Sequence, residues 1–272
     1  MVACLVSLPL AVDSLAEAIC CGLGESHLVT GMIVFLAGAT GAIGRRLVPL
    51  FISAGHGVVG TTRSTEKADE LRAAGVDPVV LDVFDREAVM RAMVSTQPDA
   101  VVHQLTDLPK RSDPALLAAA ADRNARLRIE GTRNLVDAVV ATGVTRFIAQ
   151  SIAFAYAPGQ TPHREDGPLE LSATGSRLTT VRGVVALEEM VTGTPAIQGI
   201  VLRYGRLYGP GTWRDGPNGP APLHVDAAAN AAFLALTKGA SGIYNIAEDD
   251  GEVAIDKARA ELGFDPTFRL GL

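Results

Sequence analysis

The stretch MIVFLAGATGAIGRRL, residues 32–47, decides the fold of this chain. An unbroken apolar run leads into a glycine-rich turn and then into a segment that continues as a helix. Apolar runs of this kind are typical of parallel strands that are buried on both faces. The glycines follow the spacing G-x-x-G-x-x-G. Gly38 permits a tight turn, Gly41 lets the backbone approach a ligand, and Gly44 lets the helix pack closely on the sheet.

A phosphate group fits the beginning of a helix after such a turn, because free N–H groups and the positive end of the helix dipole meet there. The order strand, glycine turn, helix is the context in which this spacing indicates a dinucleotide pyrophosphate site. The alternative is that the glycines only turn the chain. The sequence therefore predicts cofactor-binding residues at Gly38, Thr40, Gly41, Ala42, Ile43 and Gly44.

Outward from this stretch, short apolar runs alternate with amphipathic segments. We expect further strands at 57–62, 78–81, 99–104, 146–151 and 199–204, and helices at 42–54, 66–75, 85–95, 114–142 and 177–192. This alternation predicts an α/β fold with a doubly wound parallel sheet of the Rossmann type. The last third differs: we expect loops over 205–222, then a helix at 225–238, a strand at 242–246 and a helix at 252–262, which together make a small C-terminal substrate-binding part.

Composition excludes several classes of partner. The net charge of −6 leaves no basic surface for nucleic acid. All three cysteines lie within residues 1–31, so there is no disulfide framework, and no metal-binding spacing occurs. The apolar run at residues 1–12 is too short to span a bilayer, so we expect no membrane partner and a cytoplasmic protein. We expect residues 1–31 to be an N-terminal appendage, with Met32 as a possible natural start; the alternative is a helix packed on the domain.

The choice between NAD and NADP depends on the end of the second predicted strand. An NAD site places an acidic side chain there to bind the ribose 2′-hydroxyl, whereas this chain has Arg63 and Ser64. A guanidinium offers a planar fork to a 2′-phosphate, so we expect NADP rather than NAD. Alternatively, Arg63 is a solvated surface residue. Asp82 and Val83 fit a position beside the adenine, and Gln104, at the end of the fourth strand, completes the predicted site.

Several longer segments carry a family resemblance. They are GATGAIG (38–44), LDVFD (81–85), EGTRNLVDAVVATGVTRFIAQS (130–151), LRYGRLYGPG (202–211), LHVDAAANA (223–231), GIYNIAEDD (242–250) and KARAELGFDP (257–266). In these the chain resembles the NAD(P)-dependent epimerase/dehydratase family, the extended short-chain dehydrogenases/reductases. The resemblance implies a Rossmann-type NAD(P)-binding domain over 32–272, with substrate-binding elements mainly in 151–176 and 204–272.

The chain differs from this family at the positions of the family's catalytic residues. The family uses a Ser or Thr, a Tyr, and a Lys at the spacing Tyr-x-x-x-Lys, in which the Lys cation lowers the pKa of the tyrosine. No Tyr-x-x-x-Lys occurs in this sequence. Alignment on ALEE (186–189) puts Thr180 or Val181 at the tyrosine position and Val184 or Val185 at the lysine position. Arg128 replaces the Asn of the family's N-x-x-G-T motif.

Other hydroxyl groups remain as candidates for catalysis. Ser151 ends the fifth predicted strand, at the edge where open α/β sheets bind ligands, and Tyr156 follows it on a loop. We expect Tyr156 to donate a hydrogen bond to the reacting carbonyl with help from Ser151; alternatively, Tyr156 only lines the site. Tyr204, Tyr208 and Trp213 are expected to line the substrate pocket, or else to serve in packing.

Three functions follow from these observations. The first is an NADP-dependent oxidoreductase of the atypical extended type that acts on a small carbonyl or alcohol. The second is a non-catalytic NADP-binding redox sensor, and the third is a nucleotide-sugar epimerase or dehydratase, which the missing Tyr-Lys pair disfavours. The expected partners are a small-molecule substrate and a second copy of the chain, joined through the helices at 114–142 and 177–192.

Overall fold

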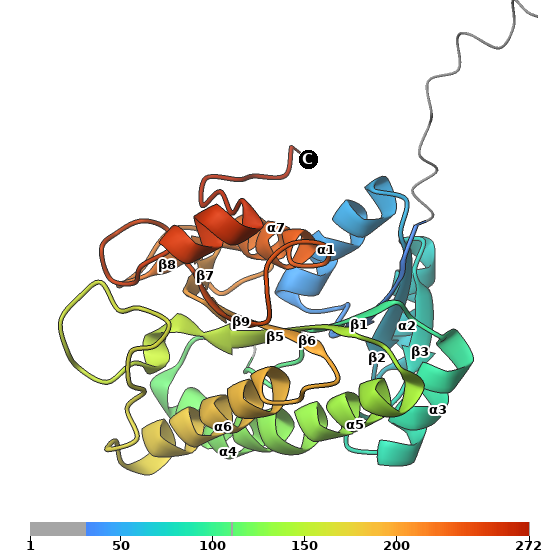
Figure 1. Cartoon of the computed structure of the whole chain (residues 1–272), viewed down its shortest axis with the longest axis horizontal. Coiled ribbons are helices and arrows are strands. Elements are labelled where there is room, and N and C mark those ends of the chain that lie inside the picture. Colours follow the sequence, from blue (N-terminus) through green and yellow to red (C-terminus); the bar gives the residue numbers. More distant parts are fainter. Residues whose placement is uncertain (1–30, 110, 272) are drawn as a thin grey trace, which may run out of the picture. The chain divides into compact units, whose positions relative to one another are not determined.

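Seven strands form one parallel sheet in the computed structural model, which describes residues 31–109 and 111–271 (Figure 1). The order across the sheet is β3-β2-β1-β4-β5-β6-β9, so β1 lies inside the sheet and the later strands extend it toward both edges. This confirms the predicted Rossmann-type α/β fold. The strands are β1 (Ile33–Ala37), β2 (Gly57–Thr62), β3 (Asp77–Val80), β4 (Ala100–His103), β5 (Arg146–Ile152), β6 (Gln198–Tyr204) and β9 (Gly242–Ile246).

Helices cover both faces of this sheet (Figure 1). One face carries α1 (Ala42–Ser53), α2 (Thr65–Ala73) and α7 (Val225–Leu234). The other face carries α3 (Arg86–Thr96), α4 (Pro114–Arg126), α5 (Thr132–Thr142) and α6 (Gly175–Thr192). Each face therefore has its own hydrophobic cluster, with the sheet between the two.

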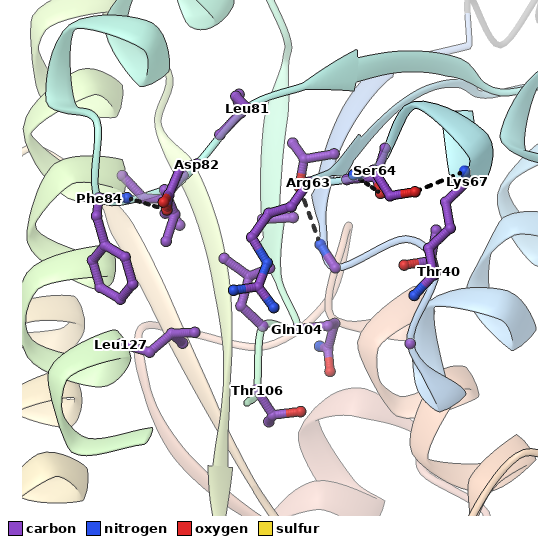
Figure 2. A pocket seen from close by; sticks show the side chains of 18 of the residues that line it. Thr40, Arg63, Ser64, Lys67, Leu81, Asp82, Phe84, Gln104, Thr106 and Leu127 are labelled. Atoms are coloured by element: carbon purple, nitrogen blue, oxygen red, sulfur yellow. Dashed lines mark hydrogen bonds between the residues drawn. The ribbon is translucent and has the colours of Figure 1, made fainter. Parts of the chain in front are cut away.

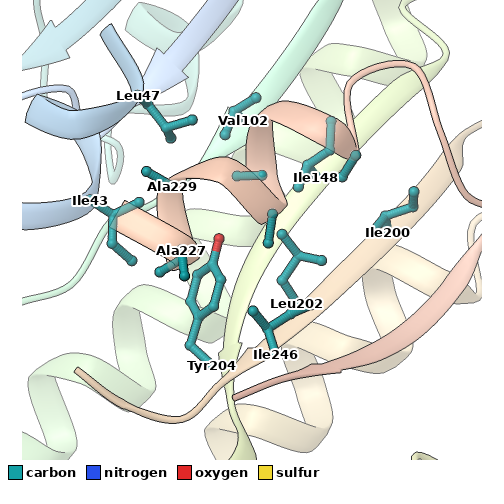
Figure 3. Packing of buried hydrophobic residues seen from close by; sticks show 14 of the residues in the cluster. Ile43, Leu47, Val102, Ile148, Ile200, Leu202, Tyr204, Ala227, Ala229 and Ile246 are labelled. Atoms are coloured by element: carbon teal, nitrogen blue, oxygen red, sulfur yellow. The ribbon is translucent and has the colours of Figure 1, made fainter. Parts of the chain in front are cut away.

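Small side chains let α7 lie close to the sheet and to α1 (Figure 3). Ala227 and Ala229 are fully buried, and Ile43 and Leu47 of α1 belong to the same cluster. Tyr204, at the end of β6, also packs there. Because burial of apolar surface is the main favourable term in folding, this cluster fixes the beginning of α1 relative to the strand ends.

The strand register brings polar residues to the carboxyl edge of the sheet. Ala37 of β1 pairs with Thr61 of β2 and with His103 of β4. Further along the sheet, Ser151 of β5 pairs with Arg203 of β6. The same Arg203 pairs with Asn245 of β9. Parallel strands end at the same edge, so these side chains lie on the side of the sheet where ligands of such folds bind.

The helical region predicted over 114–142 contains an irregular turn. A π-helical turn, η1 (Leu127–Gly131), separates α4 from α5. A π-helical turn inserts an extra residue per turn and redirects the side chains around it, and such turns are frequent at functional sites. Hydrophobic periodicity did not predict this turn, because the Ala-rich stretch reads as one continuous helix.

Two expectations for the C-terminal third need correction. The segment 205–222, expected to be rich in loops, also contains β7 (Arg206–Tyr208), which pairs in parallel with β8 (Pro222–His224). The last helix was expected to start at residue 252, but helical structure begins at residue 256, because Val253 forms a bridge with His163. These pairings join segments distant in sequence, so local periodicity does not reveal them.

The expected appendage at residues 1–31 lies outside the described residues, apart from Gly31. Among the helices that the structure describes, none is long and apolar enough to cross a membrane. Within the same residues, no group of three or more His, Cys, Asp or Glu side chains is arranged to hold a metal ion.

Candidate functional site

A pocket of about 350 Å³ opens at the carboxyl ends of β1, β2 and β4, beside the start of α1 (Figure 2). Most of the predicted cofactor residues line this pocket, namely Gly38, Thr40, Gly41, Arg63, Ser64, Asp82, Val83 and Gln104. The other three, Ala42, Ile43 and Gly44, lie in the first turn of α1 and are not part of the lining. Lys67 also lines it, as do Thr61, Leu81, Phe84, Thr106 and Leu127, which were not predicted.

Two glycines of the turn, Gly38 and Gly44, have no room for a side chain. Gly38 adopts a φ of +96°, and a Cβ at this position would lie 2.8 Å from the backbone oxygen of Gln104. A Cβ on Gly44 would lie 2.3 Å from the backbone oxygen of Gly38. No side chain caps the N-terminus of α1, which begins after Gly41. The first N–H groups of α1 therefore remain as donors for a phosphate.

Cationic side chains line the pocket at the end of β2. Arg63 extends into the space between Asp82 and Gln104, with Lys67 nearby on α2 (Figure 2). Ser64 caps α2: its hydroxyl accepts a hydrogen bond from the Lys67 backbone N–H at 3.3 Å and donates one to Glu66 at 2.5 Å. The Ser64 hydroxyl thus already serves the helix, which leaves Arg63 and Lys67 as the cationic groups of the lining.

Gln104 carries an acceptor that no described residue satisfies. Its Nε2 donates to the Tyr204 hydroxyl at 3.3 Å, but its Oε1 is buried and has no hydrogen-bond partner among the residues that the structure describes. Buried polar atoms in native proteins nearly always have partners, so a bound ligand that donates to Oε1 would complete the site. The cradle formed by Gly38 and Gly44, the open end of α1 and this orphaned oxygen fit a dinucleotide.

Ser151 belongs to a buried ionic network beyond β4. The carboxylate of Glu188, on α6, accepts from the Ser151 hydroxyl at 2.7 Å and from Arg203 at 2.9 Å and 2.6 Å. The exposed fractions of the Glu188 and Arg203 side chains are 5% and 3%. Burial lowers the pKa of Arg203, but the hydrogen bonds and charge of Glu188 outweigh it and raise this pKa overall.

Tyr156 belongs to the same network. Its hydroxyl accepts from Arg203 at 2.7 Å and donates to Asn245 at 2.7 Å, and its ring stacks on His163. Burial raises the pKa of Tyr156, although Arg203 acts in the opposite direction. Neither Tyr156 nor Ser151 lines the dinucleotide pocket. Their catalytic role stays a prediction, and the geometry favours a role in positioning β5 and β6.

The α6 positions that align with the family's Tyr and Lys carry no proton donor directed at the pocket. Val181 and Val184 are fully buried, and Thr180 donates its hydroxyl proton back to the Ser176 backbone oxygen at 2.9 Å. Val185 offers only a methyl surface. Helix α6 thus supports the sheet through apolar contacts and Glu188.

His103 is held in its neutral form. Its Nδ1 accepts from the Leu105 N–H at 3.2 Å, so Nε2 carries the proton and lies 3.1 Å from the Thr132 hydroxyl. Burial and, to a smaller extent, the charge of Arg128 lower the pKa of His103 to about 4. This arrangement ties β4 to α5 and leaves His103 no role as an acid near neutral pH.

The three aromatic residues expected in the substrate pocket are not brought together. Tyr204 is buried against Gln104, and Tyr208 donates its hydroxyl proton to Glu248 and contacts Arg269. Trp213 is 40% exposed, and its indole N–H donates to the Pro109 backbone oxygen at 3.0 Å. Trp213 thus links the loop after β7 to the loop after β4. A role of these three aromatic residues in binding substrate stays a prediction.

Comparisons with known proteins agree with this geometry. A family model described as "NAD(P)H-binding" matches residues 38–177. A Streptomyces protein named "3-diazoavenalumate denitrifying reductase" is 42% identical over 241 residues, which cover 80% of this chain and 77% of that protein.

Solved structures show the same fold at low sequence identity. The UDP-glucose 4-epimerase of Thermotoga maritima, solved with UDP-glucose, has a TM-score of 0.70 and 19% identity, covering 88% of this chain and 94% of that chain. The Bordetella bronchiseptica enzyme WbmG, solved with NAD, has a TM-score of 0.68 and 19% identity, covering 90% and 92%. These neighbours confirm the resemblance to the epimerase/dehydratase family at the level of the fold.

Proposed function

Because the chain belongs to the NAD(P)H-binding family and is an oxidoreductase-type enzyme, we propose that it is an NADP-dependent reductase that transfers hydride to a small organic acceptor. The preference for NADP is supported by Arg63 and Lys67 in the pocket lining and by the absence of a carboxylate from the lining residues at the end of β2. A guanidinium and an ammonium together favour a 2′-phosphate over a 2′-hydroxyl.

The residues that would hold the cofactor follow from the pocket. The turn from Gly38 to Gly41 and the first turn of α1 would hold the pyrophosphate, and Asp82 and Val83 would contact the adenine. Gln104 would offer its unpartnered Oε1 as a hydrogen-bond acceptor. When bound, the dihydronicotinamide supplies a hydride, which carries two electrons.

The class of acceptor follows from what surrounds the pocket. Reduction of a carbonyl needs a proton donor for the developing oxyanion. Among the described residues, the hydroxyls of Ser151 and Tyr156 are committed to the buried network, and α6 has no Tyr-Lys pair. We therefore infer an acceptor whose reduction needs no proton from the protein, and this observation carries the proposal.

A diazo group meets this requirement. In an arenediazonium ion, addition of hydride at carbon forms one C–H bond and the C–N bond breaks, so that N2 leaves with no proton required. The two electrons of the hydride complete the balance. The name of the 42% identical relative describes a diazo compound, its denitrification by reduction, and a carboxylate anion as substrate. For this chain, we propose a small carboxylate-bearing diazo compound as the acceptor.

The other functions have less support. Reduction of a small carbonyl would require Tyr156 to release Asn245 or Arg203 when substrate binds. A redox sensor would need no acceptor at all, whereas the relative is named as a reductase. Sugar-nucleotide epimerisation is supported only by neighbours with 19% identity, which share the fold. The expected homodimer stays a prediction.

The test is reduced-cofactor oxidation by the purified chain with an arenediazonium salt, and in parallel with small aldehydes and ketones. We expect oxidation of NADPH, more slowly of NADH, with release of N2 and transfer of deuterium from deuterated cofactor to carbon. Turnover of carbonyls but not of diazonium salts would contradict the proposed acceptor class. Undetectable NADPH binding would contradict the proposed function as a whole.

A further inference from the structure

Arg128 carries a guanidinium for which the described residues provide no partner. None of them accepts a hydrogen bond from it or places a carboxylate within 4.0 Å of it, although a guanidinium has five N–H donors. The residue is nevertheless partly exposed. Buried or half-buried arginines usually have an anionic partner, as Arg203 has in Glu188, so Arg128 lacks what its position requires.

The position of Arg128 is next to the dinucleotide pocket. It lies in the π-helical turn η1, directly after Leu127, which lines the pocket. Gly131, at the end of the same turn, packs so closely on Val83 of the pocket lining that a Cβ would lie 3.1 Å from a Val83 methyl group. Arg128 therefore lies in a turn that borders the cofactor pocket.

The neighbouring helix is α6, where the family's Tyr-Lys pair would stand. A Cβ on Gly183 would lie 2.9 Å from Cα of Ala125, so the backbones of α4 and α6 come close together. This contact is three residues before Arg128 in the sequence. The charge of Glu188, on α6, raises the pKa of Arg128, and the charge of Arg128 lowers the pKa of His103, at the end of β4. Arg128 therefore lies close enough to the end of β4 and to α6 to interact electrostatically with both.

The energetics show that this cation is not stabilised internally. Burial lowers the pKa of Arg128 to about 10, although the charge of Glu188 acts in the opposite direction. Glu188 is not free to pair with it, because both carboxylate oxygens already accept from Arg203 and one also accepts from Ser151. An unpaired charge at a partly exposed site costs folding free energy, and an anion from solution would offset this cost.

We propose that Arg128 is the anion receptor of the substrate site and binds the carboxylate of the acceptor. This inference rests on the proposed function, which it deepens by assigning the residue that selects anionic substrates. A carboxylate matches the guanidinium fork with two parallel N–H···O bonds. The same chemistry could be offered by a phosphate of the cofactor, so the experiment separates the two sources.

The experiment is calorimetric titration of the full chain, saturated with NADP⁺, with benzoate as the anionic probe and benzamide as the neutral probe. We expect benzoate to bind more tightly than benzamide. Arg128→Gln should weaken benzoate binding by about 10- to 100-fold and leave the affinity for NADP⁺ and benzamide unchanged. Arg128→Lys should fall between the two, because the charge remains but the fork is lost.

Arg133→Gln is the matched control, because Arg133 is an exposed arginine at the start of α5 and its loss changes the net charge equally. It should leave benzoate binding unchanged. Because the unpaired cation costs folding free energy, Arg128→Gln should unfold at the same or a higher urea concentration than the unchanged chain. A clear loss of stability would indicate a structural role and overturn the inference.

Three further results would overturn it. They are benzoate binding that does not depend on Arg128, no benzoate binding at millimolar concentration, and an equal loss of NADP⁺ affinity in Arg128→Gln, which would assign the residue to the cofactor. In turnover, the variant should raise KM for carboxylate-bearing acceptors without lowering kcat. A chain that turns over no acceptor contradicts the proposed function, whereas normal turnover without dependence on Arg128 contradicts only this inference.

Discussion

The two halves of the sheet's carboxyl edge differ in whether their polar groups have hydrogen-bond partners within the protein. Along β1, β2 and β4, donors and acceptors are left open: the uncapped start of α1, the Arg63 guanidinium and the buried Oε1 of Gln104. Along β5, β6 and β9, the polar groups satisfy one another, as in the pairing of Arg203 with Glu188. We call the edge along β1, β2 and β4 the open half, because its free polar groups can receive a ligand. We call the edge along β5, β6 and β9 the satisfied half, because its polar groups bind one another and hold the strands together.

The difference teaches how to distinguish binding residues from structural ones in such an edge. A buried polar group that has its partners stabilises the fold. When it is removed, its partner stays buried without a hydrogen bond, at the full cost of desolvation. An unpartnered group instead gains its partner from a ligand. Where the family has its Tyr-Lys pair, α6 of this chain instead contributes Glu188 to the satisfied half.

The largest effect should come from breaking the satisfied half. Glu188→Gln removes the carboxylate charge that compensates Arg203, whose side chain is 3% exposed. We expect the free energy of unfolding to fall by about 3–5 kcal/mol, measured by urea denaturation, with NADPH affinity of the folded protein preserved. Glu130→Gln, which breaks the exposed ion pair with Arg126, should cost no more than about 0.5 kcal/mol. An equally small cost for Glu188→Gln would remove the distinction between the two halves.

The next effect concerns His103, at the border between the halves. Its pKa is about 4 in the folded protein and 6.5 as an unperturbed side chain, so the unfolded state takes up its proton first as pH falls. Stability should therefore decrease from about pH 6.5 down to about pH 4, by about 3 kcal/mol in total from this group. Urea unfolding across this range should show a smaller pH dependence in His103→Gln. An unchanged pH dependence would mean that His103 is not buried in its neutral form.

A smaller effect is expected in the open half. Arg63→Gln should weaken NADPH binding by about 10- to 100-fold and leave NADH binding nearly unchanged, because only NADPH carries the 2′-phosphate. Arg72→Gln, on the exposed side of α2 where Arg72 pairs with Asp69, is the control for the change in charge. Fluorescence titration with both reduced cofactors measures the ratio. Equal loss for both cofactors would reject the assignment of Arg63 to the 2′-phosphate.

The contrast between the halves also explains what could be predicted from the sequence. The open half depends on local signals: the glycine spacing at 38–44 and Arg63 directly after a strand are contiguous in sequence, and most of the residues predicted from them line the pocket. The fold followed from the alternation of apolar runs and amphipathic segments, which local periodicity records.

The satisfied half depends on pairings between distant residues. Ser151, Glu188 and Arg203 meet only because β5, β6 and α6 pack together, so the sequence suggested a catalytic serine where the structure has a buried hydrogen bond. The π-helical turn at Leu127–Gly131 likewise gave no periodic signal. The one available clue was Arg128 itself, a cation at a position where the family has an amide.

The smallest effect decides between the two accounts of Tyr156. Tyr156→Phe removes a hydroxyl that bonds Arg203 and Asn245 at 2.7 Å each, so we expect a loss of about 1–2 kcal/mol in the free energy of unfolding. If the hydroxyl only positions β6 and β9, NADPH-dependent turnover of a diazonium acceptor should stay within about threefold of the unchanged chain, since a change of 1.4 kcal/mol would be tenfold. If Tyr156 acts as the proton donor to a carbonyl, turnover should instead fall by about 100-fold or more while NADPH binding is retained. The second result would make Tyr156 a catalytic residue rather than a structural one, and it would replace the diazo group with a carbonyl as the proposed acceptor.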